Sequence, residues 1–416
     1  MPYVIWFVPT NSSHVGKLRA FMDALSVRGH RIHLLSVDAL QASIFEATPS
    51  IEKTGYPYES LPAGGFPGGR HWLVETLYKG RLRRVLDEFL SRRQIDALVF
   101  GEDVGSVSRM FIRLARPRGV ATVMLPDGFV LPPSPHFRPG WWQTFRSWLS
   151  VIYRASLGGL GPRGTGGADR ILVMNETGLE VFAAMGIERR RIRAVGSCEY
   201  DALAAHRDRP LDAREEKALR ARLALPPDRP IVLFVDQGLL GDETMRSLVR
   251  TMALAAQQGE ATLLVKFHPR GGHYPDTWRR WAAGAGFPPQ AVVFARNECT
   301  SIEAVRLCSV CVTLYSTTAL EALVYGKPLV LVQYQNVPHI LRWGRQYGAA
   351  LEAENPEELR RAIWSALTDQ AVRERLRSGA EVAIQKELFG LDGRSADRMA
   401  DCLIELIESR CKEKTE

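Results

Sequence analysis

Short apolar runs alternate with amphipathic stretches along most of the chain. Such alternation is typical of parallel β-sheets that are covered by helices on both faces. The series opens with an expected strand at Tyr3–Val8, a helix at Val15–Arg28 that ends before Gly29, and a strand at Arg31–Ser36. The other elements expected in the first half are strands at Asp96–Phe100, Ala121–Leu125, Arg170–Met174 and Ile192–Val195, and helices at Ser106–Ala115 and Glu176–Met185. The pattern predicts a doubly wound, Rossmann-like α/β domain over residues 1–200.

A second series of the same kind follows the polar, charged segment Asp201–Arg229. Its expected strands are Ile231–Val235, Leu263–Lys266, Ala291–Phe294, Ser309–Leu314 and Leu329–Gln333. They predict a second Rossmann-like domain over residues 201–416, whose amphipathic last helix, Ala396–Ile407, can pack back on the first domain. Two such domains are expected to face each other across a cleft at the carboxyl ends of their strands, where ligands of open α/β sheets bind.

Composition narrows the classes of partner. The 416 residues carry a net charge of +8 from arginines that are dispersed along the chain, which does not favour nucleic-acid binding but suits anionic substrates or an anionic membrane surface. Among the cysteines only Cys308 and Cys311 have C-x-x-C spacing, and with no matching second pair we expect them to be core residues rather than metal ligands. Nothing suggests a disulfide framework, a signal peptide or an apolar span of ~18–20 residues, so we expect a cytoplasmic protein.

The strongest chemical signal lies in the second half. The motif Lys266–Pro269 (K-F-H-P) follows one expected strand, and Tyr315–Thr318 (Y-S-T-T) follows another and opens a helix. A helix N-terminus offers unpaired N–H donors to a phosphate, and neighbouring hydroxyls and an imidazole add further donors. The sequence therefore predicts a pocket for a nucleotide-activated substrate. The candidate donor-binding residues are Lys266, Gln237, Gly238, Ser316, Thr317, Thr318 and Glu321, with His268 on the phosphate.

These residues also have plain structural interpretations. Thr318 and Glu321 form T-x-x-E, a capping box that can exist only to start a helix. His268 can be a loop residue, and Gln237 with Gly238 can form a turn.

In the first half, acidic residues follow two expected strands. Glu102 and Asp103 come after one strand, where they can bind an acceptor or cap the helix that begins near Ser106. Asp127 and Gly128 come after the next strand, and Asp-Gly is also a common turn. His14, in the loop after the first strand, is an acceptor-side candidate.

An aromatic and basic insertion is expected near residues 136–165. It carries Trp141, Trp142 and Trp148 beside Arg146 and Arg154. Indole rings with arginines suit a membrane interface, so these tryptophans are candidates for peripheral membrane contact. Stacking on an acceptor glycan, or packing of an amphipathic helix on the domain's own core, explains the same pattern.

The order of D/E-G at Asp127-Gly128, then K-x-H-P, then a serine-threonine cluster resembles the GT-B glycosyltransferase superfamily. Within it, the motifs resemble bacterial sialyltransferases and polysialyltransferases, which use donors such as CMP-sialic acid. The segments Lys266–Pro269, Tyr315–Glu321 and Gly326–Pro328 are also similar to those of CDP-glycerol glycerophosphotransferases. A cytidine nucleotide and a capsule-type acceptor are what this resemblance implies.

UDP-N-acetylglucosamine 2-epimerases are a further relative. Gly101-Glu102-Asp103, followed by Asp127-Gly128, is similar to their acidic loop and second acidic residue, and Ala168–Asp201 is similar to their approach to the interdomain hinge. Where the epimerases carry a glycine pair and a double glutamate, this chain has Ser316–Thr318 and a single Glu321.

The resemblance implies an inverting glycosyl transfer that needs neither metal nor cofactor. The nucleotide-sugar donor would pass its sugar to a surface-polysaccharide or lipid-linked acceptor. Asp127 would be the base, Gly128 would let the backbone turn beside it, and His268 would act on the leaving phosphate, with Asp103 and Glu102 as an alternative catalytic pair. An epimerase-like isomerase, a glycerophosphotransferase and a non-catalytic sugar-nucleotide-binding GT-B protein are the other functions that the residues allow.

Overall fold

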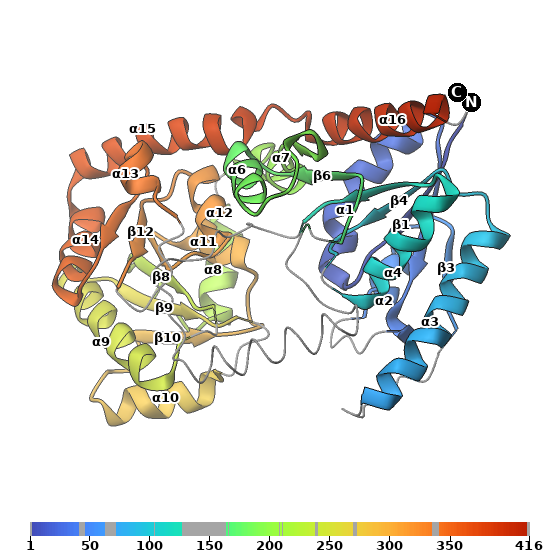
Figure 1. Cartoon of the computed structure of the whole chain (residues 1–416). Helices are drawn as coiled ribbons and strands as arrows, with labels where there is room; N and C mark the ends of the chain where they lie inside the picture. Colours follow the sequence, from blue (N-terminus) through green and yellow to red (C-terminus); the bar gives the residue numbers. More distant parts are fainter. Residues whose placement is uncertain are drawn as a thin grey trace. The chain divides into compact units, whose positions relative to one another are not determined.

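The computed structural model describes residues 2–40, 46–62, 72–103, 105–126, 164, 166–207, 209, 211–237, 240–268, 273–334 and 341–413, with residues 72–79 for their backbone alone. Contacts divide the chain into two units (Figure 1). The first holds the described residues up to Pro126, those from Gly164 to Asp201, and those from Asp392 onward. The second holds those from Ala202 to Leu391.

The first unit is built on a seven-stranded sheet in the order β3-β2-β1-β4-β5-β6-β7, and every pair of neighbours is parallel. The strands are β1 (Val4–Val8), β2 (Arg31–Ser36), β3 (Tyr58–Ser60), β4 (Ala97–Phe100), β5 (Ala121–Met124), β6 (Arg170–Val173) and β7 (Ile192–Ala194). The order reverses at β1, so β1 and β4 flank the point at which the chain changes direction across the sheet. Ligands of open α/β sheets bind at such a switch point.

Helices cover both faces of this sheet. They are α1 (Ser12–Val27), α2 (Thr48–Glu52), α3 (Trp72–Arg92), α4 (Ser106–Ala115), α6 (Glu176–Ala184), α7 (Cys198–Ala204) and α16 (Ser395–Glu413). Alternate side chains of β1 enter separate cores, because successive residues of a strand point to opposite faces. Trp6 and its neighbours in alternation pack with α3 and α4, whereas Ile5 and Phe7 pack with α1 and α16.

Helix α1 carries the three sequence signals from which a helix can be predicted: a cap residue, apolar residues at helical spacing and a glycine after its end. Asn11 caps it, since the Asn11 side chain accepts a hydrogen bond from the backbone N–H of His14 at 3.1 Å. Leu18, Met22 and Leu25 recur at helical spacing and are buried. The helix ends before Gly29, whose φ of +85° favours a residue without a Cβ.

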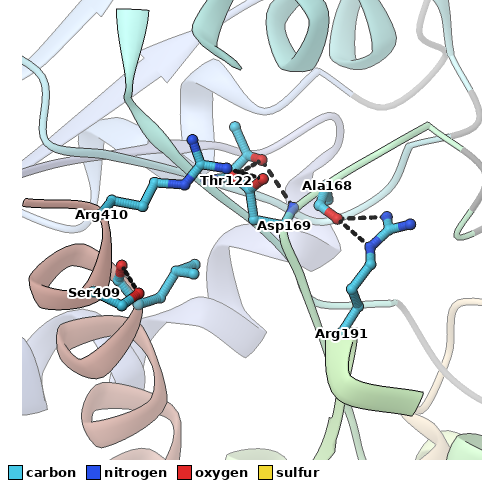
Figure 2. Close-up of polar contacts among 7 residues, drawn as sticks. Thr122, Ala168, Asp169, Arg191, Ser409 and Arg410 are labelled. Atoms are coloured by element: carbon cyan, nitrogen blue, oxygen red, sulfur yellow. Dashed lines mark hydrogen bonds and ion pairs between the residues drawn. The ribbon is translucent and has the colours of Figure 1, made fainter. Parts of the chain in front are cut away.

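Helix α16 packs on the first unit beside α1. Its buried side chains share one core with those of α1 and β1, and Arg28 of α1 pairs with Asp397 and Asp401. Near its end, Arg410 pairs with Asp169, which also accepts hydrogen bonds from the backbone N–H of Thr122 at 2.9 Å and from its hydroxyl at 2.7 Å (Figure 2). One carboxylate therefore joins α16 to the starts of β5 and β6.

The second unit is built on a six-stranded parallel sheet in the order β10-β9-β8-β11-β12-β13. The strands are β8 (Ile231–Val235), β9 (Thr262–Lys266), β10 (Val292–Ala295), β11 (Val310–Thr313), β12 (Leu329–Val332) and β13 (Leu351–Ala353). The helices are α8 (Ala213–Arg222), α9 (Asp242–Gln258), α10 (Pro275–Gly284), α11 (Ser301–Leu307), α12 (Thr318–Val324), α13 (Trp343–Tyr347), α14 (Pro356–Thr368) and α15 (Gln370–Glu387). Helices α9, α10 and α14 share one core with the sheet.

The predicted α/β class with two doubly wound parallel sheets is confirmed. The strand at Arg31–Ser36, the helix at Ser106–Ala115 and the strand at Ile231–Val235 have the predicted bounds. Helix α16 is longer at both ends than the predicted Ala396–Ile407. Within the described part of the chain, no helix is both long and apolar enough to cross a membrane.

Candidate functional site

A cavity of about 710 Å³ lies in the second unit, where the loops after β8, β9, β10 and β11 meet. Parallel strands bring their carboxyl ends to one edge of the sheet, and these loops therefore converge. The predicted donor residues that line this cavity are Lys266, His268, Ser316, Thr317, Thr318 and Glu321. The structure thus brings together residues that are far apart in the sequence, from Lys266 to Glu321.

In the loop after β9, Phe267 packs in the core and His268 faces the cavity. The Phe267 ring is fully buried and stacks on Phe294 at 5.8 Å between ring centroids. His268 follows it, is partly exposed, and lines the cavity. Because the Phe267 ring is anchored in the core, the backbone that carries the His268 imidazole is fixed at the rim of the cavity.

Lys266, the last residue of β9, is only 5% exposed. Its Nζ donates a hydrogen bond to the backbone carbonyl of Arg296, the residue that follows β10. Burial lowers the pKa of the Lys266 ammonium. Lys266 therefore joins the ends of two neighbouring strands beneath the cavity and acts first as a positioning residue.

The hydroxyl cluster lies at the start of α12. This helix begins at Thr318 with Thr317 as its N-cap, and so Thr318 is not the cap residue that a T-x-x-E capping box requires. The Ser316 hydroxyl instead accepts a hydrogen bond from the Thr318 backbone N–H at 3.2 Å and donates to the Thr318 hydroxyl at 3.1 Å. Helix α12 has only seven residues, and the side-chain hydroxyls rather than a long helix dipole characterise this corner of the cavity.

Glu321 is buried at the same corner and is 6% exposed. Its Oε1 accepts a hydrogen bond from the Ser301 hydroxyl at 3.3 Å. This contact joins α12 to the start of α11, so the Glu321 carboxylate faces the cavity from beneath the loop that follows β10.

The loop after β8 carries two further polar residues. The Gln237 side-chain carbonyl accepts a hydrogen bond from the Tyr315 backbone N–H at 3.3 Å, which ties this loop to the end of β11. Asp236 lines the cavity and is 1% exposed. Its Oδ2 lies 2.9 Å from Nδ1 of His273, whose Nε2 lies 3.3 Å from Asp242.

Sequence reasoning did not find the Asp236–His273 pair. Both side chains are buried, and the His273 ring packs against Phe267 and Trp278 at centroid distances of 5.7 and 5.2 Å. The available signal was an acidic residue directly after the strand Ile231–Val235, together with a second histidine shortly after K-F-H-P. Glu298, which also lines the cavity, was missed as well.

A second, smaller cavity of about 50 Å³ lies in the first unit, at the carboxyl ends of β1, β4, β5, β6 and β7. His14 lines it and is 3% exposed, with its Nδ1 2.9 Å from the Thr10 hydroxyl. The ring packs directly on Gly101, where an added Cβ would lie 2.3 Å from the His14 Nδ1. Lys17 and Glu199 also line the cavity, and Lys17 Nζ lies 3.4 Å from a Glu199 carboxylate oxygen.

Asp103 is completely buried. Its Oδ1 accepts a hydrogen bond from the Gly164 backbone N–H at 2.8 Å, and its Oδ2 accepts one from Gly166 at 2.6 Å. Burial lowers the pKa of the nearby Arg109 guanidinium, and the charge of Asp103 acts against that change. Both carboxylate oxygens thus hold a glycine-rich segment in place, which is a structural use of Asp103.

Neither acid of the Glu102-Asp103 pair is the N-cap of α4. The cap residue of α4 is Gly105, so the capping interpretation of Glu102 and Asp103 is wrong. Glu102 is partly exposed.

Several predicted residues lie outside the described part of the chain. They are Asp127, Gly128, Gly238, Trp141, Trp142 and Trp148. Pro126, which directly precedes Asp127 in the sequence, lines the cavity of the first unit.

No protein-family model matches the chain, and no curated protein sequence matches it. Solved structures do match. A glycosyltransferase from Rickettsia africae ESF-5 has a TM-score of 0.64 at 12% identity, with 99% of both chains covered. The calicheamicin glycosyltransferase CalG4 has a TM-score of 0.52 at 16% identity, with 98% of both chains covered. A UDP-GlcNAc 2-epimerase from Neisseria meningitidis, solved bound to UDP-GlcNAc, has a TM-score of 0.61 at 10% identity, with 97% of this chain and 100% of that chain covered. At these identities the similarity establishes the fold, and the chain has the GT-B fold of two Rossmann-like domains.

Proposed function

We propose that this protein is a GT-B glycosyltransferase that moves a sugar from a nucleotide-activated donor, with a cytidine nucleotide favoured, to a polysaccharide or glycolipid acceptor. The observation that carries the proposal is the cavity of the second unit, in which His268, the hydroxyls of Ser316–Thr318 and the Glu321 carboxylate converge. Its volume of about 710 Å³ falls within the range of ~300–1,000 Å³ that small-molecule sites occupy.

The donor phosphate would lie between His268 and the hydroxyl cluster. An imidazole and neighbouring hydroxyls are hydrogen-bond donors that suit phosphate oxygens, and His268 can also carry a positive charge near neutral pH. Glu321 would accept a hydrogen bond from a ribose hydroxyl, since a carboxylate only accepts and its Oε1 is already oriented by Ser301.

The reaction would be a metal-independent, inverting displacement. A base removes the proton of the acceptor hydroxyl, the acceptor oxygen forms a bond to the anomeric carbon, and the bond from that carbon to the phosphate oxygen breaks. The electron pair leaves with the phosphate, which His268 would stabilise by donating a hydrogen bond. We assign the base to Asp127. His14, beside the cavity that Pro126 lines, would contact the acceptor.

A nucleotide-sugar epimerase is the second candidate. The similarity to a UDP-GlcNAc 2-epimerase over almost the whole chain favours it. Against it, Asp103 is fully buried and both of its carboxylate oxygens hold backbone N–H groups, which leaves that acid poorly placed for proton transfer at a sugar carbon. A glycerophosphotransferase would use the same phosphate contacts with a CDP-glycerol donor.

The acceptor side includes a proposed membrane contact through Trp141, Trp142 and Trp148. Its basis is the sequence, in which these rings stand beside arginines. Flotation with anionic liposomes tests it, because replacing the tryptophans should release the protein from the vesicles. Unchanged flotation of the triple variant would remove the membrane contact from the proposal.

The proposed function is tested by a thermal-shift panel followed by product analysis. CMP, CDP, UDP and GDP are each added to the full chain, since a ligand that binds only the folded state raises the melting temperature. The sugar conjugate of the best nucleotide is then incubated with enzyme alone and with acceptor. A transferase changes the donor only when acceptor is present, whereas conversion to an epimeric donor by enzyme alone would identify the isomerase.

A further inference from the structure

The cavity of the second unit has two chemically different ends. At one end lie His268 and the hydroxyls of Ser316 and Thr318, of which the Thr318 hydroxyl can donate because the Ser316 hydroxyl already donates to it. At the other end, the segment after β10 contributes two carboxylates, those of Glu298 and Glu303. The imidazole and hydroxyl donors suit phosphate oxygens, which leaves the segment after β10 for the nucleoside.

The backbone groups at the end of β10 are already committed. The N–H groups of Arg296 and Asn297 both donate to Oε2 of Glu298, at 2.5 and 2.9 Å. The carbonyl of Arg296 accepts the hydrogen bond of the Lys266 ammonium. A ligand at this end consequently meets the side chain of Glu298 before it meets free backbone amides.

Glu298 is held in one orientation as an ionised acceptor. Burial works to raise its pKa, but hydrogen bonds from the backbone N–H groups of Arg296, Glu298 and Asn297 outweigh burial and hold that pKa below its ordinary value. Oε1 lies 4.0 Å from the Arg279 guanidinium, which is beyond hydrogen-bond distance. The side chain is 39% exposed and lines the cavity, so Oε1 can accept a hydrogen bond from a ligand.

The other carboxylate at this end is used differently. Glu303 closes a capping box with Thr300 at the start of α11 and pairs with Arg222 at 2.7 Å. Its oxygens are engaged within the protein, which leaves Glu298 as the acceptor that faces the ligand.

We propose that Glu298 reads the nucleobase of the donor and selects bases with an exocyclic amino group. This inference rests on the proposed function, because it takes the cavity to be a nucleotide site. Cytosine and adenine each present an amino group that donates to a carboxylate, whereas the corresponding position of uracil and hypoxanthine is a carbonyl oxygen that Glu298 would repel. Glu298 thus supplies a physical reason for a cytidine or adenine nucleotide over a uridine nucleotide.

The variant Glu298→Gln tests the inference directly, because it changes the group that faces the base and keeps the contacts that hold the loop. The glutamine carbonyl can accept the two backbone N–H bonds in place of Oε2, and the amide NH₂ then takes the position of Oε1. An acceptor that faces the base becomes a donor, with the loop still held. Glu303→Gln is the matched control, because it removes the same charge from the same cavity while keeping a residue that a capping box tolerates.

The experiment is calorimetric titration of the full chain and both variants with the pairs CMP/UMP and AMP/IMP, at one salt concentration and pH. The site is expected to hold either the pyrimidine pair or the purine pair. Within that pair, the wild type should bind the nucleotide with the amino group about tenfold or more tightly than the nucleotide without it. Glu298→Gln should reduce that ratio at least about tenfold or invert it, and Glu303→Gln should leave it unchanged. The comparison of CMP and AMP tells whether the site holds a pyrimidine or a purine.

The wild type also provides a test that needs no variant. The 5′-monophosphate of pyrimidin-2-one riboside is CMP without its amino group, and it should bind about tenfold more weakly than CMP if the pyrimidine pair is the accommodated one. Equal binding within both nucleotide pairs, or a ratio that survives in Glu298→Gln, would overturn the role of Glu298 and leave the proposed function standing. Failure of every nucleotide to bind would overturn the proposed function itself.

Discussion

The ammonium of Lys266 donates a hydrogen bond to the backbone carbonyl of Arg296, which joins the last residue of β9 to the turn after β10. Both residues line the cavity, but this bond turns the Lys266 charge toward the protein. The site is therefore organised around a buried cation that shapes the turn.

Lys266→Met should lower the free energy of unfolding by about 1–3 kcal/mol, because the Arg296 carbonyl loses a buried partner. The pKa of Lys266 is lowered in the folded state, so the unfolded state binds more protons just below the ordinary value of 10.5 and the contribution of Lys266 to stability rises with pH there. Urea unfolding from pH 8 upward should show this rise in the difference between wild type and variant. A difference that stays constant with pH would contradict the assignment.

A Gly101→Ala substitution should destabilise the first unit by about 1–3 kcal/mol. The added Cβ would lie 2.3 Å from the His14 ring, which must then leave its place in the smaller cavity. Gly16→Ala is the control, because no atom lies within 4 Å of its added Cβ and it sits inside helix α1. The control should gain about 0.5–1 kcal/mol, and equal effects of the two changes would contradict the packing account.

The buried pair of Asp236 and His273 should show strong energetic coupling. The two side chains are 1% and 8% exposed, and removing His273 takes a partner at 2.9 Å away from a buried carboxylate. His273→Ala should cost about 3–5 kcal/mol of stability, and the double variant with Asp236→Asn should cost much less than the sum of the single changes. Additive effects in this double-mutant cycle would show that the pair is not coupled.

Asp127→Asn should abolish turnover and leave donor binding unchanged, because a base that acts on the acceptor hydroxyl has no role in holding the nucleotide. His14→Asn should instead raise the KM for acceptor with a smaller effect on kcat. Steady-state kinetics over both substrates separate the two roles. Retained turnover in Asp127→Asn would remove that residue from the mechanism and make His14 the stronger candidate for the base.

The fold could be predicted where hydrophobic runs are buried on both faces. The strand Ile231–Val235 is continuous and fully buried, and its bounds were predicted to the residue. The three-residue edge strands Tyr58–Ser60 and Leu351–Ala353, which carry polar or partly exposed side chains, were missed, although the equally short edge strand Ile192–Ala194 was predicted. Short edge strands leave almost no periodic signal.

Part of the candidate site could be predicted from the positions of the strands. Residues directly after parallel strands gather at one sheet edge whatever the order of the strands, so His268 and Ser316 were expected to share a pocket. The roles of Lys266, His273 and Glu298 depend on which strands are neighbours and on where each side chain turns. The local sequence pattern predicts neither the order of the strands in the sheet nor the orientation of these side chains.

The central claim is that the cavity of the second unit binds a nucleotide by its phosphate through His268. Calorimetric titration of CMP and of cytidine, which lacks the phosphate, into the wild type and His268→Ala measures this contribution directly. The wild type should bind CMP at least about tenfold more tightly than cytidine, and His268→Ala should lose that difference while binding cytidine as before. If His268→Ala binds CMP as tightly as the wild type does, the phosphate does not lie beside His268 and the account is wrong.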